Sequence, residues 1–418
     1  MILISLLSII YSSAAGTTCS KNHYIHQDKH YAGYAEINRG KMFYYHIPHV
    51  NNKLVIWLNG GPGCSSDIGL LLENGPSIIK VNGNKDENLF GWNRLANMLY
   101  VDQPLNTGFS KGQGATSEAQ VASDFTEFMF QMLDVYPQFQ DYDIYLSGES
   151  YAGTYIPYIS QDLLKNKFNV KGLLIGNGWM DPISQYRSYI DFAKLNNLLL
   201  DKYLKEIEQK WLACERSIKS KNYIFDTTCE SIADLIFQST RDINHGKCTN
   251  MYDIRLVEEK GCGENWPYAL PEVYKYLQNP VTMAKMHVNK TWNECDGSVY
   301  QDLSKDKSRP SVELLPQLLS KVPILLFNGM NDFICNYVGQ EEMIKKLNWN
   351  NQVGFKNKPI PVHLDGVLKG EIQAENSLIF LKIQNASHMV PINQPELSFH
   401  MLKHFLDGTI VFIINVVE

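Results

Sequence analysis

The stretch from Asp141 to Tyr155 reads DYDIYLSGESYAGTY, and it decides the fold. Its first half alternates apolar and polar residues as a β-strand does, and its second half places small residues around Ser150 before a helix-like segment. A strand, a sharp turn with a serine at its tip and a following helix form a nucleophile elbow, usually written Gly-x-Ser-x-Gly. Here Ala152 holds the last small position and Gly153 follows it. The stretch therefore predicts that Ser150 is a nucleophile at the end of a buried strand.

Further apolar, β-branched runs predict the rest of the sheet. Between several of them lie helix-like segments, at 117–136 and at 155–165. Alternation of strands and helices is typical of a largely parallel sheet. A hairpin formed by 31–38 and 41–47 is expected at the start of the sheet. The additional strands are expected at 53–59, 97–102, 171–176, 322–328 and 378–384.

The alternation lapses between Pro182 and Pro310, where the sequence is rich in Lys, Glu, Asn and Tyr and holds several cysteines. Segments 201–220 and 228–238 in this region have helical periodicity. We therefore expect a helical insertion, or cap, within an α/β core. The expected organisation is a signal peptide at 1–15, the first part of the core at 16–181, the insertion at 182–310 and the second part of the core at 311–418.

The N-terminus and the cysteines indicate the secretory pathway. An apolar run from Ile2 to Ile10 precedes small residues suited to signal peptidase, and it is too short to span a membrane. The eight cysteines form no C-x-x-C pair, so this context favours disulfides over a metal site. We expect a protein without a membrane span in a lysosome, a vacuole or the extracellular space. The net charge of −6 lacks the basic excess of a nucleic-acid binder, so nucleic acid is not an expected partner.

A catalytic triad needs an acid and a histidine after Ser150, on loops that follow later strands. Asp332 lies in the loop after 322–328, and His388 lies in the loop after 378–384. The carboxyl ends of parallel strands meet at one edge of a sheet, so the three side chains are expected to lie together. In this interpretation Ser150 attacks a carbonyl carbon, His388 takes its proton, and Asp332 orients the imidazole. Taken singly, Asp332 could cap a helix, and His388 is one of eleven histidines.

The segment 57–66, WLNGGPGCSS, follows an expected strand and contains consecutive glycines. Glycines let backbone N–H groups approach a developing oxyanion without side-chain obstruction. α/β-Hydrolases take one such donor from a loop of this kind and one from the residue after the nucleophile. Gly61 and Tyr151 are therefore the expected donors. A phosphate-binding loop is the alternative, but the segment lacks the Lys-Ser/Thr ending of a P-loop.

Six motifs follow one another along the chain: WLNGGPGCSS, NMLYVDQPLNTGFS, GESYAGTYIP, GNGWMDP, NGMNDFICN and SHMVPINQPE. In this order and at these intervals they resemble the serine carboxypeptidases of the carboxypeptidase Y, Kex1 and cathepsin A type, peptidase family S10. The resemblance covers the chain from about Tyr31 to about Phe405. It implies an α/β-hydrolase fold with a mixed, mostly parallel sheet and a helical, disulfide-bonded insertion.

The resemblance implies release of C-terminal amino acids from peptides and proteins through an acyl-enzyme on Ser150. Asn59, Gly60, Glu73 and Glu149 match the positions that bind the terminal carboxylate of the substrate in this family. Two ionised glutamates would repel that carboxylate, whereas a glutamic acid pair that shares a proton can donate a hydrogen bond to it. Without the resemblance, Glu149 reads as a turn residue and Glu73 as a helix-end acid.

The resemblance also implies roles for a methionine and several cysteines. Cys335 matches a free cysteine that lines the substrate pocket, and Met389 matches a contact of the leaving residue. Both residue types also suit an ordinary core position. Of the bridges implied, the two within the insertion involve four cysteines, which allow three connectivities. The implied disulfides are Cys64–Cys295, Cys214–Cys262 and Cys229–Cys248.

Two alternatives to a carboxypeptidase are open to a chain of this kind. One is an acyltransferase that uses glucose esters, against which the carboxylate-binding set argues. The other is a non-catalytic binding or protective protein, which would lack a member of the triad. No cofactor and no metal is expected, because the chemistry needs neither. The sequence leaves open whether two copies associate as a homodimer.

Overall fold

A mixed sheet organises the chain, whose computed structural model describes residues 23–24, 30–221, 226–259 and 261–409. The expected signal peptide at 1–15 and Cys19 lie outside the described residues. The strands of the main sheet are β1 His23–Tyr24, β2 Tyr31–Ile37, β3 Gly40–Ile47, β4 Lys53–Leu58, β7 Asn97–Asp102, β8 Lys111–Gly112, β9 Asp143–Glu149, β10 Val170–Gly176, β13 Ile324–Gly329, β16 Ile360–Leu364, β17 Val367–Glu375 and β18 Leu378–Ile383.

The strand order is β1-β2-β3-β7-β4-β9-β10-β13-β18-β17-β16, with β8 paired to β3. The central strands from β7 to β18 are parallel to their neighbours, and antiparallel pairs flank them on both sides. The strands expected from the sequence are thereby confirmed, as is the mostly parallel arrangement. β16 and β17 were not expected, because most of their side chains are exposed or half-buried and form no buried apolar run.

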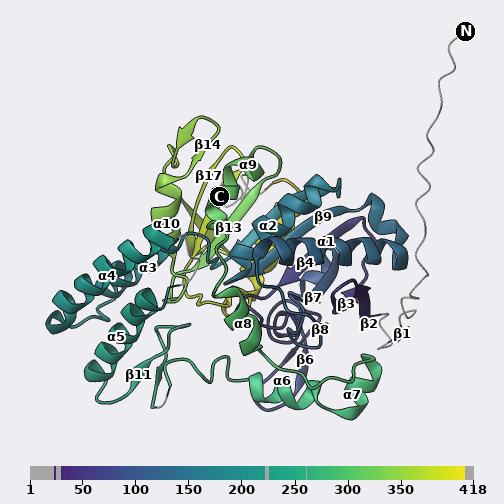
Figure 1. Ribbon diagram of the computed structural model, residues 1–418, viewed down its shortest axis with the longest axis horizontal. Helices are drawn as coiled ribbons and strands as arrows, with labels where there is room; N and C mark the ends of the chain where they lie inside the picture. The colour runs from purple at the N-terminus through teal and green to yellow at the C-terminus, as the bar shows by residue number, and fades with distance from the viewer. Residues whose placement is uncertain (1–22, 25–29, 222–225, 260, 410–418) are drawn as a thin grey trace, which may run out of the picture.

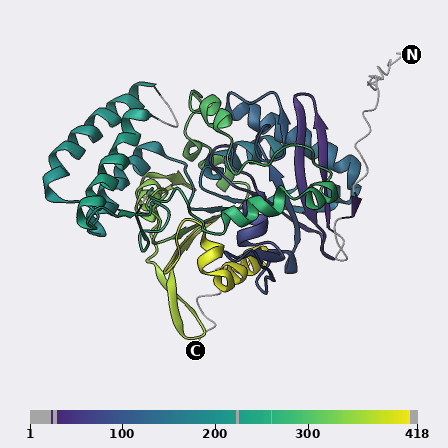
Figure 2. The same ribbon diagram turned by 90° about the horizontal axis from the view of Figure 1, so that it is seen from below.

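Strand β4 shows why helices cover both faces of the sheet. Leu54 and Ile56 belong to one hydrophobic core, and Val55 and Trp57 belong to the other. Successive side chains of a strand point to opposite faces, so an unbroken apolar strand must be covered on both sides. Figure 1 shows α1 and α2 over one face of the sheet, where they supply the first core, and Figure 2 shows the yellow helix α12 on the opposite side, where it supplies the second. The helices outside the insertion are α1 Glu118–Val135, α2 Ala152–Lys165, α9 Leu315–Leu319, α10 Tyr337–Lys346, α11 Val390–Asn393 and α12 Pro395–Leu406.

The region expected to be an insertion is mainly helical. Its two longest helices, α4 and α5, pack against each other and project from the core on the left of Figures 1 and 2. The first helix of the region, α3, packs against α10 of the core and also contacts α4 and α5. The helices here are α3 Pro182–Leu195, α4 Asp201–Lys221, α5 Thr227–Ile243, α6 Leu270–Leu277, α7 Pro280–Lys285 and α8 Gly297–Leu303.

The disulfides of this region correct the prediction. The structure forms the expected Cys64–Cys295 bridge, but it pairs Cys214 with Cys229 and Cys248 with Cys262. The nested alternative, Cys214–Cys262 and Cys229–Cys248, is wrong. Cys229 lies at the start of α5 and Cys248 lies beyond its end, so a helix about 25 Å long separates them. Cys214 instead faces Cys229 across the α4–α5 pair, with 4.7 Å between their Cα atoms.

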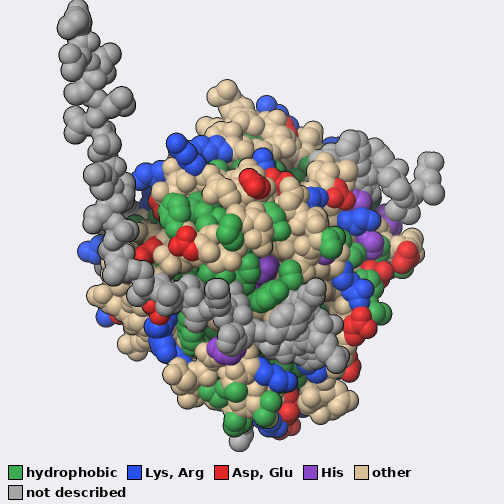
Figure 3. All heavy atoms as spheres, turned by 90° about the vertical axis from the view of Figure 1, so that its right-hand side faces the viewer, with side chains coloured by type: hydrophobic (Ala, Val, Ile, Leu, Met, Phe, Trp, Pro, Cys, Tyr) green, Lys and Arg blue, Asp and Glu red, His purple; other side chains and the backbone are tan. Residues whose placement is uncertain are grey.

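The surface carries both signs of charge. On the face shown in Figure 3, basic and acidic side chains are interspersed between small groups of hydrophobic ones. Within the ranges that the structure describes, no helix combines the length and the apolar character needed to cross a bilayer.

Candidate active site

Ser150 stands at a strained turn between β9 and α2. Its φ angle is +61°, a left-handed conformation that costs energy for a residue with a side chain. Its N–H donates to the carbonyl of Gly176, 3.0 Å away. A Cβ at Gly148 would lie 2.1 Å from the Leu58 carbonyl oxygen, and one at Gly153 would lie 2.7 Å from the Trp179 nitrogen. The small residues are therefore required because backbone from two sides crowds the turn.

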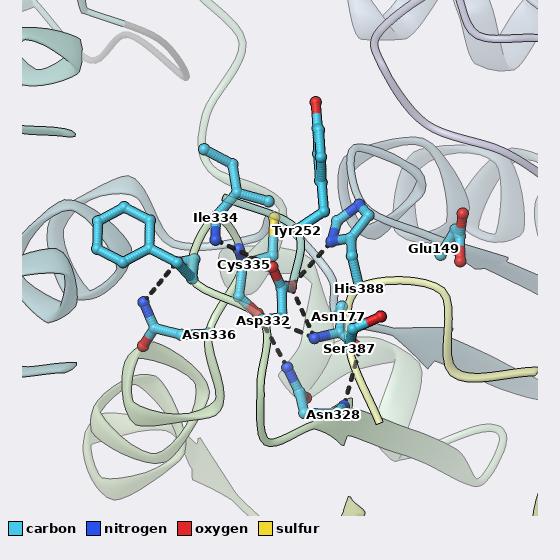
Figure 4. A network of polar contacts seen from close by, with 12 residues as sticks. Glu149, Asn177, Tyr252, Asn328, Asp332, Ile334, Cys335, Asn336, Ser387 and His388 are labelled. Carbon is cyan, nitrogen blue, oxygen red and sulfur yellow. Dashed lines mark hydrogen bonds and ion pairs between the residues drawn. The ribbon is translucent and has the colours of Figure 1, made fainter. Parts of the chain in front are cut away.

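The structure brings His388 and Asp332 together. Nδ1 of His388 lies 2.8 Å from Oδ2 of Asp332, a contact drawn in Figure 4, and both side chains are buried. The two residues follow β18 and β13, which are parallel neighbours in the sheet. Asp332 also accepts hydrogen bonds from the N–H groups of Ile334 at 3.0 Å and Cys335 at 3.2 Å. The carboxylate is thus held in one orientation, with its oxygen directed at the imidazole.

Two further residues support this pair, and neither was expected from the sequence. Asn177, which follows β10, donates from Nδ2 to Oδ2 of Asp332 at 2.8 Å. Tyr252 of the insertion places its ring 5.2 Å from that of His388, and its carbonyl accepts the His388 N–H at 3.0 Å. The signal for Asn177 was present, since it lies in the motif GNGWMDP directly after an expected strand. No local pattern marks Tyr252.

Among the described residues, Asp332, Cys335 and His388 also form a group whose potential metal-ligand atoms lie within 4.8 Å of one another. The acceptor oxygen of Asp332 is, however, already bonded to His388 and to Asn177. The arrangement therefore fits an oriented imidazole better than an open coordination site.

The loop 59–66 lies directly against the turn that carries Ser150. A Cβ at Gly60 would be 2.3 Å from the backbone nitrogen of Tyr151, so only glycine allows this approach. Gly61 and Tyr151 line one cavity together with Ser150, which places both expected oxyanion donors beside the nucleophile. The Cys64–Cys295 bridge joins this loop to the end of the insertion.

Asn59 connects the two glutamates of the expected carboxylate site. Its Oδ1 accepts hydrogen bonds from Trp57 Nε1 at 2.8 Å and from the Gly69 N–H at 3.2 Å. That orientation turns Nδ2 toward the acids, where it donates to Glu149 Oε1 at 3.0 Å and reaches Glu73 Oε1 at 3.4 Å. The amide therefore holds both carboxyl groups with a single nitrogen.

Glu73 reaches this position through a π-helical turn, η1 Gly69–Glu73. A Cβ at Gly69 would lie 2.1 Å from Trp57 Nε1, so a glycine is needed where the turn meets the indole. π-Turns are rare in proteins overall, and those that occur are often found at functional sites. No sequence pattern indicated this turn, because LLLENG is equally typical of the end of an α-helix.

The acid pair is buried and favours a shared proton. Burial raises the pKa of Glu73 to about 7. Burial also raises the pKa of Glu149 well above its ordinary value, and the charge of Glu73 and a hydrogen bond with Glu73 raise it further. Both carboxyl groups are 2% exposed. Two ionised carboxylates in contact are costly there, so the pair keeps at least one proton near neutral pH.

Ser150 lines two cavities. The glutamate pocket, of about 390 Å³, contains Asn59, Glu149, His388 and Met389. The aromatic pocket, of about 380 Å³, is formed by side chains from α3, α5 and their surroundings. Ser150, Gly61 and Tyr252 border both cavities. The aromatic pocket is lined by Trp179, Tyr186, Tyr189, Phe237, Met251, Tyr300 and Cys335, together with Glu230 and Asp234.

The remaining expected site residues divide between these cavities. Gly60 lines the glutamate pocket, as Met389 does, whereas Glu73 lies behind it and contacts it through Asn59. Cys335 is the free cysteine among the described residues, and it is 3% exposed at the wall of the aromatic pocket. Every sequence-derived candidate for chemistry or recognition thus lies in or next to one of the two cavities.

Comparison with known proteins agrees with this geometry. Residues 21–408 match the family described as serine carboxypeptidase. The pheromone-processing carboxypeptidase KEX1 of Tuber melanosporum is 40% identical over 91% of this chain and 66% of its own length. The corresponding protein of Coccidioides posadasii is 37% identical over 96% of this chain and 70% of its own length. The chain thus spans about two thirds of the length of such relatives.

A solved structure is also similar. The crystal structure of Kex1Δp, a prohormone-processing carboxypeptidase from Saccharomyces cerevisiae, superposes with a TM-score of 0.84 at 29% sequence identity. The superposition covers 94% of this chain and 95% of that one, so both the sheet and the helical insertion are shared.

Proposed function

The chain belongs to the serine carboxypeptidase family, and on that basis we propose that it releases C-terminal amino acids from peptides and proteins. The observation that carries the proposal is the pairing of two features at one cavity. The glutamate pocket contains both Ser150 with His388 and the Asn59–Glu149 contact. An exopeptidase needs a nucleophile beside a group that binds the terminal carboxylate of the substrate.

The proposed reaction proceeds through an acyl-enzyme. Ser150 Oγ attacks the carbonyl carbon of the last peptide bond while its proton passes to Nε2 of His388, the nitrogen that does not face Asp332. The backbone N–H groups of Gly61 and Tyr151 stabilise the oxyanion. The carbon–nitrogen bond then breaks, and His388 returns the proton to the leaving amine. Water then attacks the acyl carbon while His388 takes its proton. The bond from this carbon to Ser150 Oγ breaks, His388 returns the proton to Ser150, and the shortened peptide leaves with a new carboxyl group.

The acid pair explains the preference for a free C-terminus. The terminal carboxylate is expected to accept hydrogen bonds from Asn59 Nδ2, from the Gly60 amide and from the proton shared by Glu149 and Glu73. An internal peptide bond cannot supply an acceptor with that charge. The pocket therefore selects the chain end, and the released product is a single amino acid.

The floor of the glutamate pocket adds a finer proposal. Glu294 and Asp296 line it, and burial raises the pKa of Glu294 to about 7. A cationic side chain on the leaving residue would offset the cost of ionising such an acid. We therefore expect the protein to release Lys and Arg faster than Leu or Glu.

The proposed compartment is the secretory pathway. The three disulfides of the described residues support it, because such bridges form and persist in oxidising compartments.

One assay tests the proposed function against its alternatives. N-blocked dipeptides with a free C-terminus, the matching C-terminal amides and a glucose ester with an alcohol acceptor are incubated with the protein, and the products are separated. Release of the C-terminal amino acid from the free acids is expected. Ester product with intact peptides would indicate an acyltransferase, and no product from any substrate would indicate a non-catalytic protein. Varying the terminal residue in the same panel tests the preference for Lys and Arg.

A further inference from the structure

Asp102 is a buried acid that lies behind the active site. It ends β7, which is separated from β9 and Ser150 by β4. Its side chain is 1% exposed, so it is placed to contact the protein and not the substrate. The proposed reaction gives it no role.

The carboxylate of Asp102 holds the end of the loop 59–66. Oδ1 accepts hydrogen bonds from Ser65 Oγ at 2.6 Å and from the Ser66 N–H at 3.0 Å. Oδ2 accepts the N–H of Phe109 at 2.7 Å. A Cβ at Gly108 would lie 2.1 Å from the same oxygen, so the neighbouring loop is shaped to fit the carboxylate.

The same loop closes on itself at Ser66. Its Oγ donates to the carbonyl of Val101 at 2.7 Å and accepts the backbone N–H of Asn59 at 3.2 Å. Within the loop, the Cys64 N–H donates to the Gly60 carbonyl at 3.0 Å. A shift of Ser66 would therefore move Asn59 and the two glycines that follow it.

The groups around Asp102 compensate its charge from several sides. Trp292 Nε1 donates to Ser65 Oγ at 2.9 Å, which directs the serine hydroxyl toward the carboxylate. Lys290, held by the carbonyls of Asn106 and Ser110, supplies a nearby positive charge. The facing acid is Asp67, whose pKa burial and the charge of Asp102 raise well above its ordinary value. Asp67 is therefore the acid that keeps its proton, and Asp102 is the one that accepts the hydrogen bonds from the loop.

We propose that Asp102 is a positioning residue that sets the loop 59–66, and through it both the oxyanion donor Gly61 and the carboxylate-binding Asn59. The proposal rests on the proposed function, because it assumes those two roles. A displacement of about 1 Å at a reacting group can cost on the order of 100-fold in rate. Loss of Asp102 should therefore impair catalysis and recognition together, although it contacts neither substrate nor nucleophile.

The test compares Asp102→Ala, Asp102→Asn and Ser65→Ala with Asp124→Asn. Asp124 is a matched control, since it is also a buried acid but pairs with Arg39 away from the loop. Each protein is first titrated with a fluorophosphonate to count active sites. The wild-type protein must be labelled at Ser150 at this step. If it is not labelled, the proposed function is refuted, and the role of Asp102 is not what has failed.

In titrated enzyme, kcat is expected to fall about 100-fold in Asp102→Ala and about 10-fold in the other two loop variants. Asparagine keeps one acceptor oxygen but turns an NH₂ group toward the Phe109 N–H, so its effect is intermediate. The inhibition constant of a peptide aldehyde, which forms a tetrahedral adduct, should rise by the same factor. KM should rise more for free-acid peptides than for the matching amides.

A purely structural role predicts a different result. Lower thermal stability with unchanged kcat per titrated site, or an equal loss of kcat in Asp124→Asn, would overturn the proposal. If Asp102→Ala does not fold, Asp102→Asn and Ser65→Ala decide the question, because each removes only part of the contacts. Unchanged kcat and aldehyde binding in both would refute it.

Discussion

The glutamate pocket and the aromatic pocket share Ser150 but are built differently. The glutamate pocket combines loops of the core with the end of the insertion, which contributes Glu294 and Asp296. Its core polar groups are fixed by hydrogen bonds such as that between Asn59 and Glu149. The aromatic pocket is closed by α5 of the insertion, whose Ala233 and Phe237 face it. The groups that we propose for chemistry and for binding the terminal carboxylate thus come from the core. The insertion supplies acids to the glutamate pocket and walls to the aromatic pocket, which we propose holds the preceding residue.

This difference has a physical basis. Buried polar groups must be satisfied by fixed partners, so their positions tolerate little change. Aromatic walls contribute area and shape, and hydrophobic contacts tolerate substitution of similar volume. We therefore expect changes in the glutamate pocket to alter catalysis or binding of the carboxylate, and changes in the aromatic pocket to alter the choice of the penultimate residue.

The largest effect is expected where the two pockets meet. Ser150→Ala should lower kcat on the order of a million-fold for every substrate, as removal of a triad nucleophile does. The fold should be retained, since the residue points into the cavities. Fluorophosphonate labelling followed by peptide mapping locates the nucleophile. A label on any other serine of the wild-type protein would disprove the assignment.

The glutamate pocket should respond to pH through its shared proton. Glu73 ionises first, since its pKa is raised to about 7, and its charge together with burial raises the pKa of Glu149. The pair therefore loses its shared proton only as the pH rises above about 7. KM for free-acid peptides should therefore increase several-fold above pH 7, whereas KM for the matching amides stays nearly constant. Glu149→Gln keeps a hydrogen-bond donor without the charge and should reduce the increase. Parallel KM profiles for acids and amides would show that the pair does not read the carboxylate.

The aromatic pocket should respond to added bulk at Cys335. Burial raises the pKa of this thiol, so it should react slowly with mercurials, which then occupy space beside Ser150. Inhibition is expected to be several-fold stronger for substrates with a large penultimate side chain than for those with glycine. Cys335→Ala provides the control, since it should lose sensitivity to the reagent. Full activity after complete modification would place the thiol outside the pocket.

The smallest effect concerns the support of the turn itself. Tyr151 donates from its hydroxyl to Glu118 at 2.8 Å, and burial raises the pKa of Glu118 to about 8. The folded state therefore keeps a proton that the unfolded chain releases above its ordinary pKa of 4.5, so stability falls as the pH rises from about 4.5 to about 8. In Glu118→Gln, the decrease of Tm between about pH 4.5 and about pH 8 should be smaller than in wild type by roughly 2 °C. Calorimetry across this pH range measures the decrease. An unchanged slope would mean that other acids cause it.

Sequence and structure agree best in the positions of residues that follow the ends of strands. Ser150, Asp332 and His388 each follow an apolar run, and the order of the runs in a parallel sheet brings such loops to one edge. Prediction failed in the insertion, where the disulfide partners depend on how α4 packs against α5. Cys214 and Cys229 pair because two helices lie antiparallel, and no local pattern encodes that packing.

By itself, the sequence determined the strands, the nucleophile elbow and the family, because periodicity and turn chemistry are local properties of the chain. The tertiary structure decided which polar groups meet. Asn59 joins Glu73 to Glu149 only because a π-turn packs against Trp57 at Gly69 and ends with Glu73 beside the amide. Asp102 reaches Ser65 only because β7 lies beside β4. These contacts depend on buried charges finding partners from remote segments, and that requirement is met only when the whole sheet has formed.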